Sequence, residues 1–264
     1  MDRTKRLAAL RRERAQLVAY LKTLNGDEWE APSAAEGWSV RDVVAHLGAT
    51  TLSLLGPGMR QVLTADSAEA FNDTAVDKRR GWPLEKVLGE FVRTSALASH
   101  MLRVTSRQPL ASLHVPIAEL GSYPMGLTPS LLVFDWHVHL RHDIAPAIGK
   151  PAPATDSDRM SAVLEWMFAG MEQMNRDSMN WVKEPLSIEL TGLAGGRWLV
   201  GAASGAGLRV TPETDASTAS ACIAGSTDQF PAWATTRIPW RTADLTLTGD
   251  AAYATRFLDT LNIV

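Results

Sequence analysis

The chain has 264 residues, 45% hydrophobic and 21% charged, a composition typical of a globular protein with one large or two modest domains. Its formal net charge of −3 lacks the basic balance that nucleic-acid binding requires, so we expect no nucleic-acid partner. No apolar run approaches the roughly 20 residues of a membrane span. The charged N-terminal stretch contains no continuous apolar signal core, so we expect no membrane partner and a cytoplasmic location.

Apolar residues recur at helical intervals through the first half of the chain, which predicts an antiparallel four-helix bundle. Ser39 and Asp42 form a predicted capping box at the start of the second helix. Thr128 is the expected N-cap of the fourth helix, with Pro129 in its first turn. The expected helices are residues 3–24, 37–55, 82–104 and 128–149.

A Pro/Ala-rich segment at residues 149–158 is the best candidate for a boundary between a helical domain, 1–150, and a second domain, 151–264. After one more helix, the hydrophobic period changes from 3.6 to two, which predicts strands separated by glycine turns. A short helix is expected to start with Ser226 as its cap, and a final helix with Asp250. The second domain is therefore predicted to be α+β with a small, mostly antiparallel sheet. The expected strands are residues 186–192, 196–202, 207–212, 220–225 and 244–249.

The single cysteine, Cys222, excludes an intramolecular disulfide and a cysteine-based metal cage. It lies in the alternating stretch 217–225, where a buried, inert thiol is favoured over a reactive one. If the protein uses thiol chemistry, the thiol therefore comes from another molecule.

Three histidines and two aspartates fall within residues 135–144. On a helix, Asp135 and His139 share a face because they are four residues apart, whereas His137 points almost oppositely. On a strand all three would share a face, but the span without turn signals favours a helix. His46 lies at the edge of the apolar stripe of the second helix. Two imidazoles and one carboxylate occupy three corners of a tetrahedron and leave the fourth open, as in catalytic zinc sites.

Other interpretations of these side chains stay open. In the first alternative, no metal is bound: Asp135 and His139 form a buried hydrogen bond with each other, and His46 is an ordinary core histidine. The same ligand set also suits a non-haem Fe(II) oxygenase, although nothing else here resembles the strand-borne ligands usual in those enzymes. A di-iron bundle would need a second carboxylate/histidine motif on another helix, and the sequence has none.

Several segments resemble a known family. "GWSVRDVVAHLGA", "FNDTAVDKRRGWPLEKVLGEF" and "FDWHVHLRHDIAPAIGKP" are similar to the N-terminal domain of the mycothiol-dependent maleylpyruvate isomerase family, part of the DinB-like metal-binding superfamily. "FPAWATTRI" and "LTLTGDAAYATRFLDTL" resemble the sterol-carrier-like domain attached to these proteins. The resemblance covers nearly the whole chain.

The resemblance implies a zinc-like divalent ion held by His46, Asp135 and His139, with mycothiol as the thiol cosubstrate. The isomerase has glutamate where this chain has Asp135, one methylene shorter, so metal binding is expected to persist while the isomerase's own reaction is less firmly assigned. The resemblance also implies a catalytic arginine from the second domain, which stabilises a developing enolate or carboxylate. Arg237 is the first candidate and Arg241 the second, against the alternative that each is an ordinary surface arginine.

We therefore expect a metal-dependent enzyme in which mycothiol attacks a small-molecule electrophile, as a cis–trans isomerase or as an S-transferase. A thiol at the open metal position would be deprotonated at neutral pH. The sequence makes no prediction of the electrophile or of the oligomeric state. His142 is a candidate for orienting a ligand or carrying a proton, and Trp38 is expected to pack at the bundle entrance. The alternative is a binding module that holds a small apolar ligand beside a residual metal site without turnover.

Overall fold

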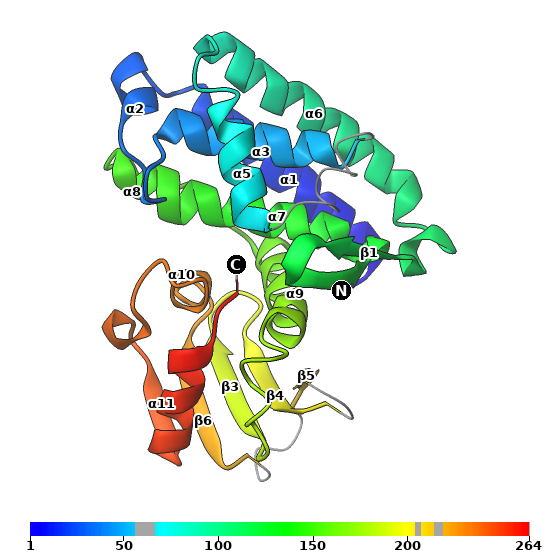
Figure 1. The fold of residues 1–264 in the computed structure, drawn as a ribbon, viewed down its shortest axis with the longest axis vertical. Coiled ribbons are helices and arrows are strands. Elements are labelled where there is room, and N and C mark those ends of the chain that lie inside the picture. Colours follow the sequence, from blue (N-terminus) through cyan, green and yellow to red (C-terminus); the bar gives the residue numbers. More distant parts are fainter. Residues whose placement is uncertain (56–66, 204–206, 214–218, 264) are drawn as a thin grey trace. The chain divides into compact units, whose positions relative to one another are not determined.

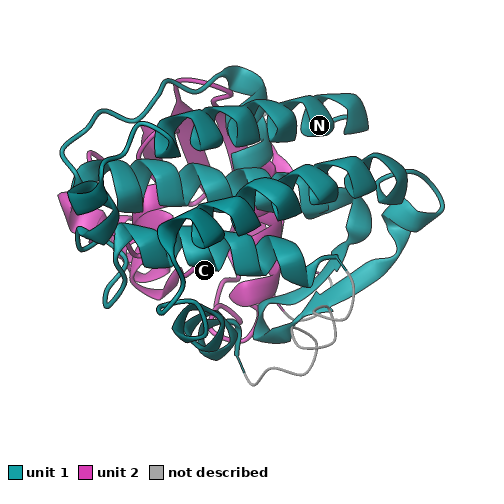
Figure 2. Ribbon diagram, turned by 90° about the horizontal axis from the view of Figure 1, so that it is seen from above, with its two compact units in different colours: residues 1–163 teal, residues 164–264 magenta. Residues whose placement is uncertain are grey.

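The computed structural model describes residues 1–55, 67–203, 207–213 and 219–263, which form two compact units. Unit 1 comprises residues 1–163 and unit 2 residues 164–264 (Figure 2). Residues 150–156 have no regular structure and precede helix α9 (Ser157–Met174), which contributes residues to both units. Among the described residues, no helix is long and apolar enough to cross a membrane.

Unit 1 is helical, and its long helices lie side by side (Figure 1). Helix α3 packs on α6, and α1 packs on both α6 and α7. These four helices occur in the four regions where the apolar periodicity predicts them. Their bounds are α1 Arg3–Leu21, α3 Val40–Ser53, α6 Leu84–Thr105 and α7 Thr128–Val138. The shorter elements are α2 Gly26–Glu30, α5 Ala68–Asp77, β1 His114–Ile117, β2 Gly121–Pro124, a π-helical turn His139–Ile144, α8 Ala145–Ala147, and 3-10 turns at Leu110–Ser112, Ala118–Leu120 and Met125–Leu127.

The core of unit 1 is formed by the apolar faces of the long helices. Leu10 and Leu17 of α1, Leu47 of α3, Phe91 of α6 and Trp136 of α7 are all fully buried. The rings of Phe91 and Trp136 meet edge to face, with their centroids 5.6 Å apart. Such burial is the main favourable contribution to folding, and it fixes the positions of α3 and α7 relative to each other.

Two sequence expectations about helix starts have different outcomes. The capping box at the start of α3 is confirmed: the Ser39 side chain accepts from the Asp42 backbone N–H, and the Asp42 carboxylate accepts from the Ser39 N–H. Thr128, in contrast, is not the N-cap of α7. Its backbone is already helical because the 3-10 turn Met125–Leu127 runs directly into the helix, and Leu127 takes the cap position without a side-chain hydrogen bond.

Unit 2 contains a five-stranded mixed sheet with strand order β5-β4-β3-β6-β7 (Figure 1). Three of the four pairings between these described strands are antiparallel, and β3 pairs with β6 in parallel. All five strands coincide with predicted ones. Helix α10 begins only at Phe230, so Ser226 is not its cap; its Oγ accepts a hydrogen bond from the Gln229 N–H within the preceding turn. The bounds are β3 Leu186–Thr191, β4 Gly196–Ala202, β5 Leu208–Pro212, β6 Ala221–Ser226, β7 Thr246–Gly249, α10 Phe230–Ala234, a 3-10 turn Trp240–Thr242, and α11 Ala251–Thr260.

Candidate metal centre

His46 is carried by the second turn of α3, on the side of the helix that faces α7. The capping box at Ser39 fixes where this helix begins, and the buried residues Val43 and Leu47 anchor the same face to the core. The imidazole of His46 is itself buried, and its side chain is only 6% exposed. A histidine in this position cannot move far without repacking the bundle.

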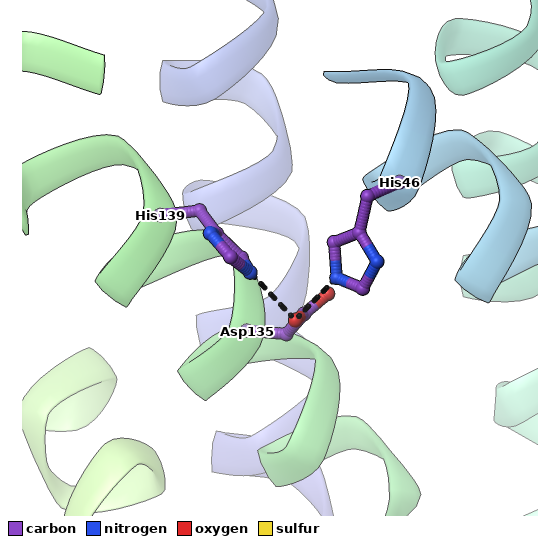
Figure 3. A group of neighbouring side chains, drawn as sticks. All are labelled: His46, Asp135 and His139. Carbon is purple, nitrogen blue, oxygen red and sulfur yellow. Dashed lines mark ion pairs between the residues drawn. The ribbon is translucent and has the colours of Figure 1, made fainter. Parts of the chain in front are cut away.

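Asp135 and His139 come from successive turns at the end of α7, where a spacing of four residues places both on one face. Both side chains point toward His46 across the gap between α7 and α3 (Figure 3). His137 points to the other side of α7, as the helical spacing predicts, and its Nδ1 lies 4.0 Å from the buried carboxylate of Glu13 on α1. Burial, reinforced by the positive charges of Arg141, His142 and Arg159, holds the pKa of His137 well below its usual range.

One oxygen of Asp135 lies between the two imidazoles. Its Oδ1 is 3.5 Å from Nε2 of His46 and 3.5 Å from Nε2 of His139 (Figure 3). Each of the three residues offers one ligand atom, and these atoms all lie within 4.8 Å of one another. The structure therefore brings together the three side chains that the sequence analysis selects as metal ligands.

The spacing of these atoms can be compared with the geometry that a metal ion demands. Zinc–nitrogen and zinc–oxygen bonds of about 2.0–2.1 Å in a tetrahedron place neighbouring donors about 3.3–3.4 Å apart. An octahedral ion with bonds of about 2.1 Å places adjacent donors only about 3.0 Å apart. The two separations from Asp135, each 3.5 Å, lie within a few tenths of an ångström of the tetrahedral spacing, and two imidazoles with one carboxylate are a donor set that several divalent metals accept.

Asp143 supports the site from behind. Its carboxylate is fully buried, and its Oδ2 lies 2.6 Å from Nδ1 of His139. A carboxylate accepts, so this hydrogen bond places the proton on Nδ1 and leaves the lone pair of Nε2 free to face Asp135 and His46. The sequence suggests His142 for this orienting role, whereas the structure assigns it to Asp143, one residue further along. The sequence contains a signal for this role of Asp143, because the four-residue interval from Asp135 to His139 leads, when repeated, to residue 143.

The two arginine candidates lie in unit 2. The guanidinium of Arg237, which follows α10, is partly buried and donates to the Thr235 hydroxyl at 3.0 Å. Arg241 is exposed and forms a two-pronged ion pair with Asp259, at 2.7 and 3.0 Å. This pairing raises the pKa of Arg241 and lowers that of Asp259. Arg241 therefore has a surface partner within unit 2.

The chain thus combines a helical unit, which carries a His/Asp/His cluster with two buried imidazoles as a candidate metal site, with an α+β unit that follows it. The chain belongs to the family described as "Mycothiol maleylpyruvate isomerase N-terminal domain", which matches residues 10–145. That match contains all three cluster residues as well as Asp143.

Similar proteins are also found over nearly the full chain. Two Mycobacterium tuberculosis proteins, "Uncharacterized protein Rv0036c" from strain ATCC 25618 / H37Rv and "Uncharacterized protein MT0041" from strain CDC 1551 / Oshkosh, are each 26% identical over 258 residues. The alignment covers 93% of this chain and 90% of each relative. The crystal structure of the mycothiol-dependent maleylpyruvate isomerase has the same fold, with a TM-score of 0.61 at 18% identity, covering 94% of this chain and 93% of that one. A crystal structure of a point mutant of that enzyme matches equally well.

Proposed function

We propose that this protein is a metal-dependent enzyme that uses mycothiol to attack a small-molecule electrophile. The observation that carries the proposal is the convergence of His46, Asp135 and His139 on one point, in a chain that belongs to the mycothiol maleylpyruvate isomerase family. A zinc ion held there would leave its fourth position open to a thiol and would lower the pKa of that thiol, so that the thiolate forms at neutral pH. Cys222 is the only cysteine, and burial raises the pKa of its thiol, so a thiol from outside the chain suits this chemistry.

The roles of the side chains follow from their positions. His46 and His139 each direct Nε2 at the shared point, and Asp135 supplies one negative charge that partly neutralises a divalent ion. Asp143 holds the tautomer of His139 that ligation needs. The buried surroundings of the two imidazoles reduce competition from water. By resemblance, Arg237 is assigned to the negative charge that develops on an enolate or carboxylate oxygen of the electrophile.

Two reactions of a thiolate are consistent with this site. In an isomerisation, sulfur bonds to one carbon of an activated cis double bond, and the displaced π electrons move to a conjugated carbonyl oxygen. Rotation about the resulting single bond precedes cleavage of the carbon–sulfur bond, which restores the double bond in trans geometry and returns the thiolate. In an S-transfer, the new carbon–sulfur bond persists and a leaving group departs with its electron pair.

The family resemblance extends the proposal to both units. We propose that the long helices of unit 1 form an antiparallel DinB-like bundle and that unit 2 is a sterol-carrier-like domain. An α+β unit of that kind is suited to hold the organic part of a small ligand. The competing function, a binding module without turnover, uses the same residues and differs only in whether product forms.

The direct test is a reaction of the zinc-loaded protein with mycothiol and a panel of maleyl-type and halogenated electrophiles, followed by mass spectrometry. Isomerised product without an adduct supports the isomerase, and a stable mycothiol conjugate supports the transferase. Protein in which Asp135 is replaced by alanine is the control and is expected to be inactive. Retention of zinc with no conversion of any electrophile would favour the binding module, and oxygen consumption by an iron-loaded sample would favour an oxygenase.

A further inference from the structure

Trp38 lies beside the metal cluster in a loop that is rigidly held. The loop runs from Ala31 to Trp38 and leads directly into the Ser39 cap of α3. Ser33 holds the carbonyl of Trp38 through both its N–H, at 2.9 Å, and its hydroxyl, at 2.8 Å. The Trp38 N–H donates to the Ala35 carbonyl at 3.1 Å. Gly37, at φ +77°, allows the turn that these bonds close.

The same loop contacts both segments that carry the metal ligands. The Ala34 N–H donates to the backbone carbonyl of Asp143 at 3.2 Å, which ties the loop to the π-helical turn after α7. At its other end, the Trp38 indole packs on the imidazole of His46, with centroids 5.2 Å apart. The ring of His139 also lies against that imidazole, with centroids 4.9 Å apart. The indole is thus an aromatic neighbour of one metal ligand.

The orientation of the indole is fixed by its polar edge. Nε1 of Trp38 donates to Oδ1 of Asp73 on α5 at 3.2 Å. This bond satisfies the only hydrogen-bond donor of the indole, so what remains for further contacts is its apolar ring. Trp38 is partly exposed, whereas His46 is buried beneath it. Part of Trp38 is therefore accessible beside the imidazole of His46.

We propose that the indole of Trp38 contacts the ligand bound at the metal centre and favours ligands that carry a flat, conjugated group. The inference rests on the proposed function for its location and adds a chemical class: planar, conjugated electrophiles rather than saturated ones of the same size. Aromatic rings prefer stacked or edge-to-face contact with other π systems, and a saturated ring lacks that preference. Flatness is also the property that an activated carbon–carbon double bond conjugated to a carbonyl possesses.

The test compares two metal-binding probes that differ only in flatness. Benzohydroxamate and cyclohexanecarbohydroxamate present the same chelating group to cobalt-substituted protein, and their affinities are read from the visible absorption of cobalt. The wild-type protein is expected to prefer the aromatic probe. Trp38→Leu, which keeps an apolar side chain without a π face, is expected to reduce that preference by about two- to tenfold, and Trp38→Phe is expected to retain most of it.

His100→Gln, which changes an exposed histidine of α6, is the control, and its preference should equal that of the wild type. An unchanged preference in Trp38→Leu, with cobalt still bound, would overturn the inference and leave the proposed function intact. A parallel titration of the wild-type cobalt protein with mycothiol tests the proposed function separately, since a missing sulfur-to-cobalt absorption band contradicts that function without affecting the hydroxamate ratio.

Discussion

The carboxylate of Asp143 lies 2.6 Å from Nδ1 of His139, one helical turn after the residue that it supports. Since an acceptor at Nδ1 fixes the ring tautomer, Asp143 would act on a metal at the candidate site through His139, without itself being a ligand. Asp143→Asn is expected to weaken zinc binding by about 10- to 100-fold, measured by competition with a chromophoric chelator. His100→Gln, which changes an exposed histidine of α6, is the control and should bind zinc as the wild type does. Equal zinc affinities in all three proteins would contradict the role given to Asp143.

Zinc binding is expected to survive replacement of Asp135 by a longer carboxylate but not the loss of the carboxylate. Asp135→Ala should abolish stoichiometric zinc binding because only two imidazoles remain in the cluster. Asp135→Glu keeps the carboxylate on a side chain one methylene longer and is expected to retain one zinc per chain. Metal content after dialysis, measured by elemental analysis, distinguishes the two variants. Zinc retained at one equivalent by Asp135→Ala would place the metal elsewhere.

Glu13 is the centre of a buried ion-pair network on the opposite side of α7. Its carboxylate is fully buried and accepts from Arg141 and Arg159, the latter at 3.1 Å. Glu13→Gln removes the counter-charge of Arg141 and one of the two carboxylates that pair with Arg159, which keeps Asp156 at 2.9 Å, and we expect it to lower the free energy of unfolding by about 3–5 kcal/mol. Urea denaturation provides the measurement.

The control for this network is the ion pair between Arg209 and Glu172 in unit 2, which are 3.8 Å apart, with the Arg209 side chain 67% exposed. Water screens such a pair, so Arg209→Ala should cost no more than about 1 kcal/mol. Similar losses in the two variants would show that burial does not set the strength of the Glu13 network.

The Ser39 cap is expected to contribute to the stability of the helix that carries His46. Ser39→Ala removes the acceptor for the Asp42 N–H and should cost about 0.5–2 kcal/mol in thermal or urea unfolding. Thr128 is predicted from the sequence to be an N-cap but does not cap α7 in the structure. Thr128→Ala should therefore change the free energy of unfolding by less than about 0.5 kcal/mol. A larger loss at Thr128 than at Ser39 would be inconsistent with the capping geometry described here.

Cys222 is expected to react slowly with alkylating reagents at neutral pH. Burial raises the pKa of its thiol and outweighs the opposing effect of Arg197, whose Nη2 lies 3.9 Å from Sγ. A raised pKa means that less thiolate is present at a given pH, so the rate of modification by iodoacetamide should rise with pH. The pH at the midpoint of this rise should be higher for the folded protein than for the urea-unfolded protein. A midpoint equal to or below the unfolded one would indicate an activated cysteine.

The elements that the sequence predicts best are those whose pattern is local. The helices of unit 1 and the strands of unit 2 have regular apolar periods, and the ligand pair Asp135 and His139 follows from the helical repeat alone. Helix α5 and the β1–β2 hairpin are not predicted, because α5 is short and partly exposed and the hairpin has only four residues in each strand. The parallel pairing of β3 with β6 joins residues far apart in sequence, which no local pattern encodes.

The candidate site likewise combines features that a local sequence pattern predicts with features that depend on tertiary structure. The position of His46 at the edge of an apolar stripe makes it a candidate ligand, and the packing of α3 near α7 brings it to Asp135. The role of Asp143 depends on which rotamer His139 adopts, and the position of Trp38 depends on hydrogen bonds within its loop. These relationships are tertiary, so they become visible only when the chain is folded.

The steps of four from Asp135 to His139 and from His139 to Asp143 make this segment sensitive to length. Each residue added to a helix turns the following side chains by about 100°, so one insertion or deletion between residues 135 and 143 would direct the ligand or its supporting carboxylate away from the cluster. Point substitutions elsewhere in the segment leave this register unchanged. Among related sequences, variation here should therefore take the form of replacements, and gaps should fall outside these nine positions.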